Sequence, residues 1–429
     1  MRVPVALRLA FGLASASCIA PEEPAAESIF LDSAGVKIVL DDGESKWRDN
    51  EHLRLSSRPV LQIGTAEGEE TAFHNVVDAL RLVDGTIVVA NAGSSEIRFF
   101  GESGDFLYSV GRGGDGPGDF QRLMALSYLE PDSVLLAFDH WTTRVTEFGR
   151  GGDLVRTVSP AIAENGRASD TGPRLVPLGW LSSGILVARR EHRDTGATAP
   201  AQDGESLLSS RGTVHLHFFD RDGRPTAHVD ALPGNERVAR VGVSGSQLFL
   251  SSVPVPFLNT FEGAVGGQTV VVGNTELFDL RVYDHNGALV HIIRRRGPRR
   301  KVGSGDRQAW IDAQLSGVSD PAVRSRQRRQ YERMAFPSTM PSFRSLGLGD
   351  DGRIWVEEFD PAASTSSESR WTVYDERGER LGQVAMPPRF RPLRIGRGYV
   401  LGVWKDGFGI EYVRLYELTA PDVVGNPNR

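Results

Sequence analysis

The chain has 429 residues, of which 40% are hydrophobic and 24% are charged, and its net charge is −6. Its 48 glycines favour many tight turns over long helices. This composition excludes a general electrostatic attraction to nucleic acid or to an anionic membrane, and no internal stretch approaches the ~18 unbroken apolar residues of a membrane-spanning helix.

The first 18 residues predict an exported protein. Arg2 precedes an apolar stretch that ends near Leu13, as in a secretory signal peptide. The segment from Ser15 to Cys18 resembles a bacterial lipobox, which implies cleavage before Cys18 and acylation of its thiol, although Ser15 stands where the pattern prefers leucine. The alternative is an ordinary signal peptide with an incidental cysteine. Because Cys18 is the only cysteine, a disulfide framework is excluded in either case.

Residues 19–35 are rich in Pro, Ala and Glu, and we expect them to form a flexible tether. From residue 36 to residue 420 the chain repeats two strand signatures. The first is an alternating strand that ends in an aromatic residue and runs into a turn with glycine. It occurs at 97–100, 144–148, 215–219, 280–283, 371–374 and, without a following hairpin, at 413–416.

The second signature is a Gly or Asp turn that leads into a nearly continuous apolar strand. It occurs at 84–89, 132–136, 183–187, 267–272, 351–356 and 398–403. Strands that are apolar on both sides are expected where radial sheets pack against one another. Six copies of each signature predict an all-β fold, a six-bladed β-propeller of four-stranded antiparallel blades. Two separate β-sandwiches would not explain the matched copies.

The two ends of the repeat region predict how the ring closes. The last unit lacks an outermost strand, whereas residues 60–64 resemble the first unit's outer strand at 106–111. We therefore predict that the early strand completes the last blade, which removes the sheet edges that would otherwise be exposed. Residues 421–429 are expected to form a tail.

One loop carries a resemblance to a known family. Residues 111–120 form a glycine-rich loop that closes on Gly-Pro-Gly and an acidic-aromatic pair, and it is similar to NHL-type repeats. With Trp47, the Asp84–Gly85 turn, Asn91 and the ending at 401–418, the chain resembles the bacterial family of six-bladed propeller lipoproteins. The resemblance implies a location at the cell envelope and, since members of that family are largely uncharacterised, it implies no activity.

The insertions between strands are expected on one face of the ring. If the strands of a blade are labelled a to d from the axis outward, the a–b and c–d turns are short. The b–c and d–a connections contain nearly all insertions, which are 161–173, 190–211, 233–253, 297–341 and 357–370. Long connections are often functional, so this face is the predicted recognition surface.

The insertion at 297–341 is expected to be basic and helical. Between residues 294 and 333 the sequence has twelve basic and four acidic residues. Asp320 followed by Pro321 is a good helix start, and a second helix is expected to begin at Asp306, so that the two form a lid over this face. Four arginines are candidates for binding an anionic glycan, a phosphate or a lipid headgroup: Arg299, Arg300, Arg324 and Arg328. The alternative is a solvated helix whose arginines pair with acidic loops.

Aromatic and polar residues near the strand ends are the candidate ligand contacts. They are His74, Arg112, Asp139, His140, Trp141, Trp404 and Asp406. Aromatic rings beside polar groups suit carbohydrate or peptide ligands, and ordinary loop packing is the alternative. The residues expected around the axis are mixed and rather basic, so we predict no catalytic residue, no metal and no cofactor.

These observations favour a non-catalytic protein of the cell envelope that binds a protein or a glycan. We expect a monomer that reaches the membrane only through a lipid anchor and does not bind nucleic acid. An alternative from another class is a propeller hydrolase or lyase that acts on a small or sugar-derived substrate. A nucleic-acid-binding propeller has only the arginine-rich segment in its favour.

Overall fold

The computed structural model describes residues 30–33, 35–47, 52–130, 132–161, 174–193, 198–199, 206–244, 247–253, 255–334, 336–361 and 367–420. The predicted signal peptide with Cys18 and the predicted tail at 421–429 lie outside the described residues. No helix in the described part of the chain is long and apolar enough to cross a membrane.

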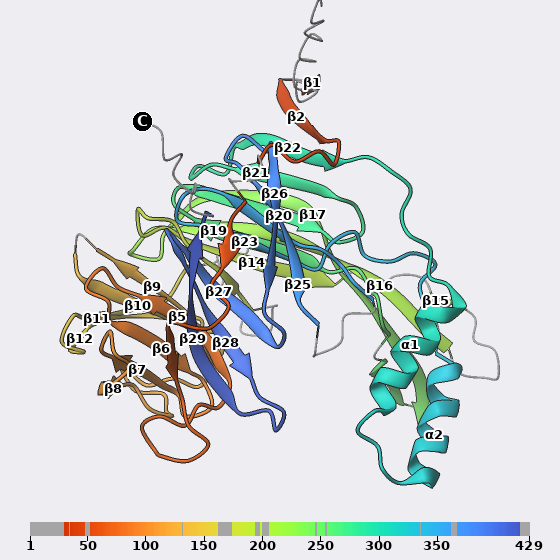
Figure 1. The fold of residues 1–429 in the computed structure, drawn as a ribbon, viewed down its shortest axis with the longest axis horizontal. Helices are drawn as coiled ribbons and strands as arrows, with labels where there is room; N and C mark the ends of the chain where they lie inside the picture. Colours follow the sequence, from red (N-terminus) through yellow and green to blue (C-terminus); the bar gives the residue numbers. More distant parts are fainter. Residues whose placement is uncertain are drawn as a thin grey trace, which may run out of the picture.

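Six antiparallel sheets form the blades of a ring (Figure 1). From the axis outward, blade 1 contains β5 (Val76–Arg81), β6 (Ile87–Asn91), β7 (Glu96–Phe100) and β8 (Phe106–Val110). Blade 2 contains β9 (Leu123–Leu129), β10 (Val134–Asp139), β11 (Arg144–Gly149) and β12 (Leu154–Val158). Blade 3 contains β13 (Val176–Trp180), β14 (Leu186–Arg193), β16 (Ser206–Phe219) and β17 (Pro225–Ser244), extended by β15 (Thr198–Ala199) and β18 (Gln247–Val253).

Blade 4 contains β19 (Phe261–Gly266), β20 (Thr269–Asn274), β21 (Asp279–Tyr283) and β22 (Leu289–Arg295). Blade 5 contains β23 (Ser345–Leu348), β24 (Ile354–Glu357), β25 (Ser369–Tyr374) and β26 (Arg380–Met386). Blade 6 contains β27 (Phe390–Gly396), β28 (Tyr399–Lys405), β29 (Glu411–Thr419) and β4 (Leu61–Ile63). The first strand of each blade contacts the first strand of the next, from β5 round to β27 and back to β5. The predicted six-bladed propeller is confirmed.

The turns and the core follow the repeat that the sequence shows. The glycine of the repeated turn adopts a positive φ, for example 91° at Gly104 and 87° at Gly152, which glycine reaches without strain. One hydrophobic cluster lies between each pair of neighbouring blades. Phe100 of blade 1, for example, packs in the same cluster as Leu401 of blade 6. The inner strands are apolar on both sides because each blade is covered on both faces.

An N-terminal strand closes the ring, as predicted. Strand β4 pairs antiparallel with β29, with Ile63 opposite Val413 and Leu61 opposite Leu415. Ile63 is 3% exposed and joins the hydrophobic cluster between blades 6 and 1. The pairing therefore provides the fourth strand of blade 6 and covers the edge of β29.

Blade 3 differs from the sequence-based expectation. The insertions at 190–211 and 233–253 were expected to be loops, but β14, β16 and β17 continue outward through them and β18 pairs with the end of β17. The alternating sequence at 238–243 explains this continuation, because paired strands satisfy backbone groups that a loop would leave to water. Blade 3 thus projects beyond the ring as a long sheet.

The basic insertion forms two helices, α1 (Ser304–Leu315) and α2 (Pro321–Glu332). The carboxylate of Asp320 accepts hydrogen bonds from the backbone N–H groups of Ala322 and Val323, as expected for the cap of α2. Helix α1 begins two residues before Asp306. The predicted lid is wrong, because the two helices stand apart from the inner strands of the ring in Figure 1. The aromatic ring of Trp310 packs against Tyr331 between the two helices.

The segment before β4 lies along the outer edges of three blades. Strand β2 (Val36–Asp41) pairs in parallel with β22 of blade 4, and β1 (Phe30–Ser33) pairs with β2. Trp47 then lies on Gly382 of blade 5, where a Cβ would be 2.2 Å from the indole. Strand β3 (Arg54–Leu55) pairs with β29 of blade 6. We call residues 30–33, 35–47 and 52–64 the belt. Strand β1 belongs to it, although the sequence placed these residues in the tether.

A buried carboxylate holds the belt to the ring. The side chain of Asp41 is 0% exposed, and its Oδ2 accepts hydrogen bonds from Arg295 Nε and the Tyr374 hydroxyl, both at 2.7 Å. Arg295 also pairs with Glu358 at 3.1 Å. Burial by itself would raise the pKa of Asp41, but the Arg295 guanidinium and the Tyr374 hydroxyl outweigh it, so that this pKa lies below its ordinary value.

Removing the closing contact should weaken the whole ring. We expect Ile63→Ala to lower the free energy of unfolding by about 2–5 kcal/mol, because it leaves a cavity between blades 6 and 1. Val60→Ala is the control, since Val60 is 53% exposed and its change should stay within about 0.5 kcal/mol. Urea denaturation measures both variants. Equal midpoints for the two would contradict the role of β4.

Neutralising Asp41 should loosen the belt in a pH-dependent way. We expect Asp41→Asn to cost about 3 kcal/mol at pH 7, the lower end for breaking a buried ion pair, since Arg295 keeps Glu358. The folded pKa of Asp41 is depressed, so its contribution is present above the unfolded pKa of about 3.9 and is lost as the pH falls through the folded value. Thermal unfolding should therefore separate wild type from variant at pH 7 and bring them together in strong acid. If the difference in melting temperature between wild type and variant persists at low pH, the ionised Asp41 carboxylate is not what holds the belt.

Candidate functional site

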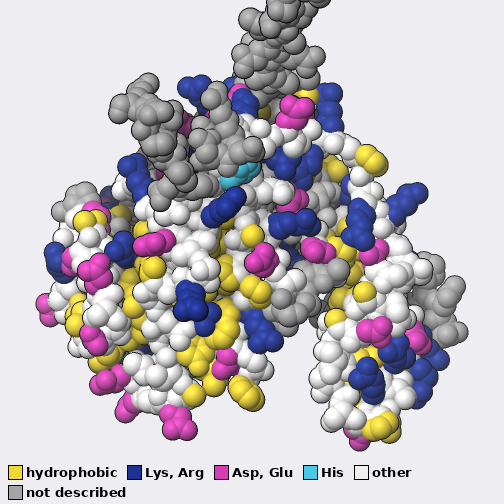
Figure 2. All heavy atoms as spheres, viewed as in Figure 1, with side chains coloured by type: hydrophobic (Ala, Val, Ile, Leu, Met, Phe, Trp, Pro, Cys, Tyr) yellow, Lys and Arg dark blue, Asp and Glu magenta, His cyan; other side chains and the backbone are white. Residues whose placement is uncertain are grey.

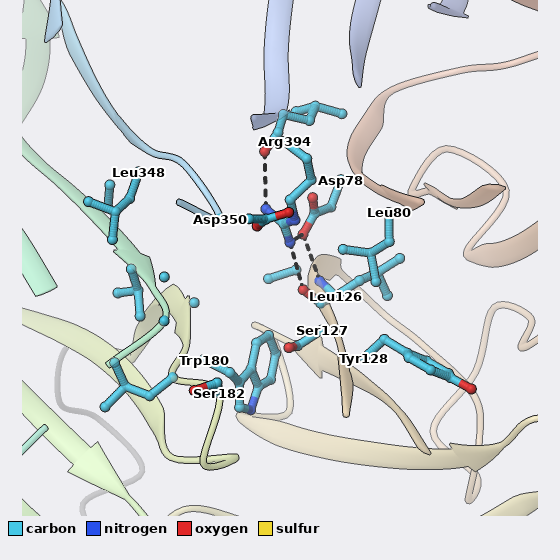
Figure 3. A pocket seen from close by; sticks show the side chains of 18 of the residues that line it. Asp78, Leu80, Leu126, Ser127, Tyr128, Trp180, Ser182, Leu348, Asp350 and Arg394 are labelled. Carbon is cyan, nitrogen blue, oxygen red and sulfur yellow. Dashed lines mark hydrogen bonds and ion pairs between the residues drawn. The ribbon is translucent and has the colours of Figure 1, made fainter. Parts of the chain in front are cut away.

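A cavity of about 640 Å³ lies on the axis of the ring, among the inner strands of the blades (Figure 3). Its lining includes residues one or two positions after the ends of those strands, such as Val83, Glu130, Ser182 and Arg397. The cavity therefore opens on the face of the short a–b turns, which is opposite to the insertion-rich face. This volume lies within the range of about 300–1,000 Å³ that is typical of small-molecule sites.

The centre of the cavity contains an ion pair between blades 1 and 6. Arg394 Nη2 donates to Asp78 Oδ2 at 2.9 Å and to the Leu126 carbonyl oxygen at 2.8 Å. The N–H of Leu126 donates to the same carboxylate oxygen at 2.8 Å. Arg394, Asp78 and Leu126 come from β27, β5 and β9, so this network joins three blades at the axis (Figure 3).

Burial changes the acidity of the carboxyl groups in the cavity. It raises the pKa of Asp78 above its ordinary value, even though Arg394 and two backbone N–H groups favour the ionised form. Asp350 lies beside Arg394 at the mouth (Figure 3), and partial desolvation there raises its pKa as well. The oxygens of Asp78 already accept from Ala79, Leu126 and Arg394, whereas Asp350 is exposed and can offer its carboxyl group to a ligand.

Aromatic rings and balanced charges complete the lining. Trp180 and Tyr399 contribute rings, and the Arg81 guanidinium lies 5.4 Å from the centre of the Tyr399 ring. Burial raises the pKa of Tyr399 to about 12, so its hydroxyl stays protonated. The charged lining residues balance, because three are basic and three acidic: Arg81, Arg394, Arg397, Asp78, Glu130 and Asp350. In the described part of the chain, no group of three or more His, Cys, Asp or Glu side chains is placed to hold a metal ion.

Two predicted ligand contacts on blade 2 have structural roles. Asp139 is 0% exposed, and its carboxylate accepts from the N–H groups of Gln121, Arg122 and Thr142. It therefore holds a turn and does not face a ligand. The Nδ1 atom of His140 lies 2.8 Å from the Leu175 carbonyl, and burial lowers the pKa of this imidazole.

The predicted aromatic contacts are separated on the insertion-rich face. Trp141 is 51% exposed, with the Arg174 guanidinium 4.5 Å from its ring centre. Trp404 is covered by Arg414, whose guanidinium lies 3.5 Å from the ring centre. Asp406 caps a turn by accepting from Phe408 N at 2.8 Å, and Phe408 itself is 94% exposed at the tip. The exposed aromatic residue of this hairpin is therefore Phe408, which was not among the predicted contacts.

The remaining candidates do not converge on one site. The backbone N–H of His74 donates to Asn91 Oδ1 at 2.8 Å, and its exposed side chain lies against Gly93. Arg112 Nε pairs with Asp119 Oδ1 at 3.0 Å within the glycine-rich loop.

The four candidate anion-binding arginines are each engaged within the protein. Arg299 pairs with Glu276 at 3.4 Å, and Arg300 pairs with Asp306 at 2.6 Å. Arg328 pairs with Asp312 of α1 at 2.6 Å, and Arg324 donates to the Leu315 carbonyl at the end of that helix. Lys and Arg side chains still gather on the surface of the helical lobe (Figure 2). The alternative that these arginines pair with acidic residues thus describes this structure well.

The axial residues were not among the predicted contacts, although the sequence carries a signal for them. Asp78 and Arg394 are charged residues inside inner strands that are otherwise largely apolar. A charge at such a position needs a partner across the axis. Their pairing could not be deduced, because 315 intervening residues separate them and the register of both strands decides which side chains meet.

Comparisons with known proteins do not assign the chain to a family. No family model matches it, and no curated protein matches it. Among solved structures, a protein of Bacteroides fragilis is 11% identical, with 89% of this chain and 99% of that chain covered and a TM-score of 0.47. A member of the DUF4221 family from Bacteroides vulgatus is 10% identical, with 87% and 100% covered and a TM-score of 0.44.

A virginiamycin B lyase from Staphylococcus aureus is 8% identical, with 85% of this chain and 99% of that chain covered and a TM-score of 0.36. Identities and scores this low transfer no activity, substrate or location to this chain. The propeller fold rests on the strand pairings described above. The resemblance to NHL repeats and to envelope lipoproteins stays a prediction from the sequence.

Removing Arg394 should make stability depend on pH. In Arg394→Gln the buried Asp78 loses its cation, so its already raised pKa rises further. Below the unfolded pKa of about 3.9, Asp78 is protonated in both states and costs the variant no stability. As the pH rises from there through the raised pKa of the folded state, ionisation favours the unfolded state and the variant loses stability. We expect a loss of about 3–5 kcal/mol at pH 8 and a smaller loss at pH 5, measured by urea denaturation. The double variant with Asp78→Asn should lack this pH dependence; if it keeps it, another group is responsible.

Proposed function

We propose that this chain is a non-catalytic binding protein that holds the end of a saccharide in the axial cavity. The observation that carries the proposal is the combination, in one cavity of about 640 Å³, of a fixed Asp78–Arg394 pair, aromatic rings and zero net lining charge. A strongly charged ligand would find no excess of opposite charge there. A neutral ligand rich in hydroxyl groups can both donate to carboxylates and accept from guanidinium groups.

The rigidity of the polar groups supports binding. Arg394 is held by Asp78, the Leu126 carbonyl and the Leu393 carbonyl, so a ligand meets donors that are already oriented. Its Nε has no hydrogen-bond partner among the described residues and is available to a ligand hydroxyl. Trp180 and Tyr399 add apolar surface to the lining, against which the less polar side of a sugar ring can pack.

In this proposal the small molecule binds on the face of the short a–b turns. The long insertions had indicated the opposite face as the recognition surface. The candidate contacts on the insertion-rich face are separated, whereas the axial residues converge on one space. A location outside the cytoplasm agrees with this proposal, because saccharides are abundant in cell envelopes. That location, with anchoring through Cys18, rests on the sequence of the first 18 residues alone.

The test is a glycan array followed by calorimetric titration of the best ligand. We expect Asp350→Asn to weaken binding about tenfold, since it removes a charged hydrogen-bond acceptor at the mouth. Asp351→Asn is the matched control, because Asp351 is the next carboxylate along the chain and caps its own turn through Arg353 N.

A second control compares the two faces. Trp141→Ala removes the exposed ring on the insertion-rich face and should leave saccharide binding unchanged. If Trp141→Ala abolishes binding and Asp350→Asn does not, the recognition surface is the insertion-rich face. If no glycan on the array binds, the proposed function is wrong.

A further inference from the structure

A second pocket, of about 320 Å³, lies where the helical insertion leaves blade 4. It is bounded by residues 294–300 at the end of β22 and by the b–c turn of blade 4 at 277–279. Residues 340–342, where the insertion returns, and Phe359 of blade 5 complete it. It belongs to the insertion-rich face and shares no lining residue with the axial cavity.

One wall of this pocket is strongly basic. Five of the lining residues are arginines and one is acidic: Arg294, Arg295, Arg296, Arg299, Arg300 and Asp279. Arg294 is paired with Asp279 at 2.6 Å, and Arg295 is paired with Asp41 at 2.7 Å. These ion pairs hold Arg294 and Arg295 in place and neutralise part of the positive charge of the wall.

Two arginines keep donors for a ligand. Arg296 is exposed and has no hydrogen-bond or ion-pair partner among the described residues. Arg299 touches Glu276 through Nη1 at 3.4 Å, but its Nε is buried and has no hydrogen-bond partner within the described part of the chain. A buried guanidinium N–H without an acceptor is costly, and an anion that accepts from it would remove that cost.

Several of the other lining residues are apolar. Leu277 is 55% exposed beside the pocket, and Met340, Pro341 and Phe359 also line it. A ligand that fills the space therefore needs an anionic group at one end and a less polar body at the other. Guanidinium groups suit phosphate oxygens particularly well, because they donate in a planar fork.

We infer that this pocket binds a phosphate-bearing ligand, with the phosphate on Arg296 and Arg299 and its body against Leu277 and Phe359. The site is independent of saccharide binding in the axial cavity. Of the four arginines proposed from the sequence, Arg299 and Arg300 line this pocket, whereas Arg324 and Arg328 hold the two helices together.

The experiment titrates the full chain with three probes: inorganic phosphate, glucose 6-phosphate and vesicles containing phosphatidylglycerol. We expect Arg296→Gln and Arg299→Gln each to weaken binding of the probe that binds best by about tenfold. Arg326→Gln is the matched control, because Arg326 is an exposed arginine of α2 outside the pocket. Preference for the sugar phosphate or for the vesicles identifies a soluble ester or a lipid headgroup as the source.

Two results would overturn the inference. Equal weakening by Arg296→Gln and Arg326→Gln would show a diffuse charge effect, and failure of all three probes to bind would show that the pocket is not a phosphate site. Circular dichroism of the variants excludes loss of folding as the cause. Saccharide binding in the axial cavity should stay unchanged in Arg296→Gln, so this inference and the proposed function can fail separately.

Discussion

The short pairing of β4 with β29 is the constraint on which the rest of the molecule depends. Strand β4 pairs with the part of β29 at Val413–Leu415 as an outermost strand of blade 6, and its Ile63 completes the hydrophobic cluster between blades 6 and 1. The six inner strands surround one axis because the ring is closed. A cavity on that axis is thus a product of closure, since each blade supplies part of its wall.

Two buried ion pairs connect parts of the chain that lie far apart in sequence. Asp41 and Arg295 join the belt to blade 4, and Asp78 and Arg394 join blade 1 to blade 6 at the axis. Desolvation makes such pairs weak sources of net stability, but a missing partner is costly. Their effect is to favour one arrangement of blades and belt. The belt adds a parallel and an antiparallel strand at the outer edge of blade 4, which covers the edge of β22.

The two faces of the ring differ in construction. The face of the a–b turns is formed by short connections, and the axial cavity opens there among groups held by the inner strands. The other face has the long sheet of blade 3 and the two helices, which stand apart from the inner strands in Figure 1. The basic pocket of about 320 Å³ lies where the helical insertion leaves blade 4. Rigid inner strands therefore position one candidate site, and the insertion together with its neighbouring turns creates the other.

The sequence by itself determined the number of blades and the order of the repeated strands within them. Period-two alternation and turn glycines are local properties, so six copies of them predicted six blades, and the likeness of residues 60–64 to 106–111 predicted the closing strand. The helix start at Asp320 and Pro321 was readable for the same reason. The loops expected in blade 3 were wrong because the length of an insertion does not reveal whether its backbone finds a partner strand.

Only the tertiary structure decided which charges meet. Asp78 and Arg394 face each other because β5 and β27 are neighbours around the axis, and Asp139 is a buried cap because three backbone N–H groups converge on it. Whether an arginine is paired or available likewise depends on acids brought near by folding, as the contrast between Arg300 and Arg296 shows. Electrostatic contacts and cavities arise from the relative positions of distant segments, and local sequence patterns contain no record of those positions.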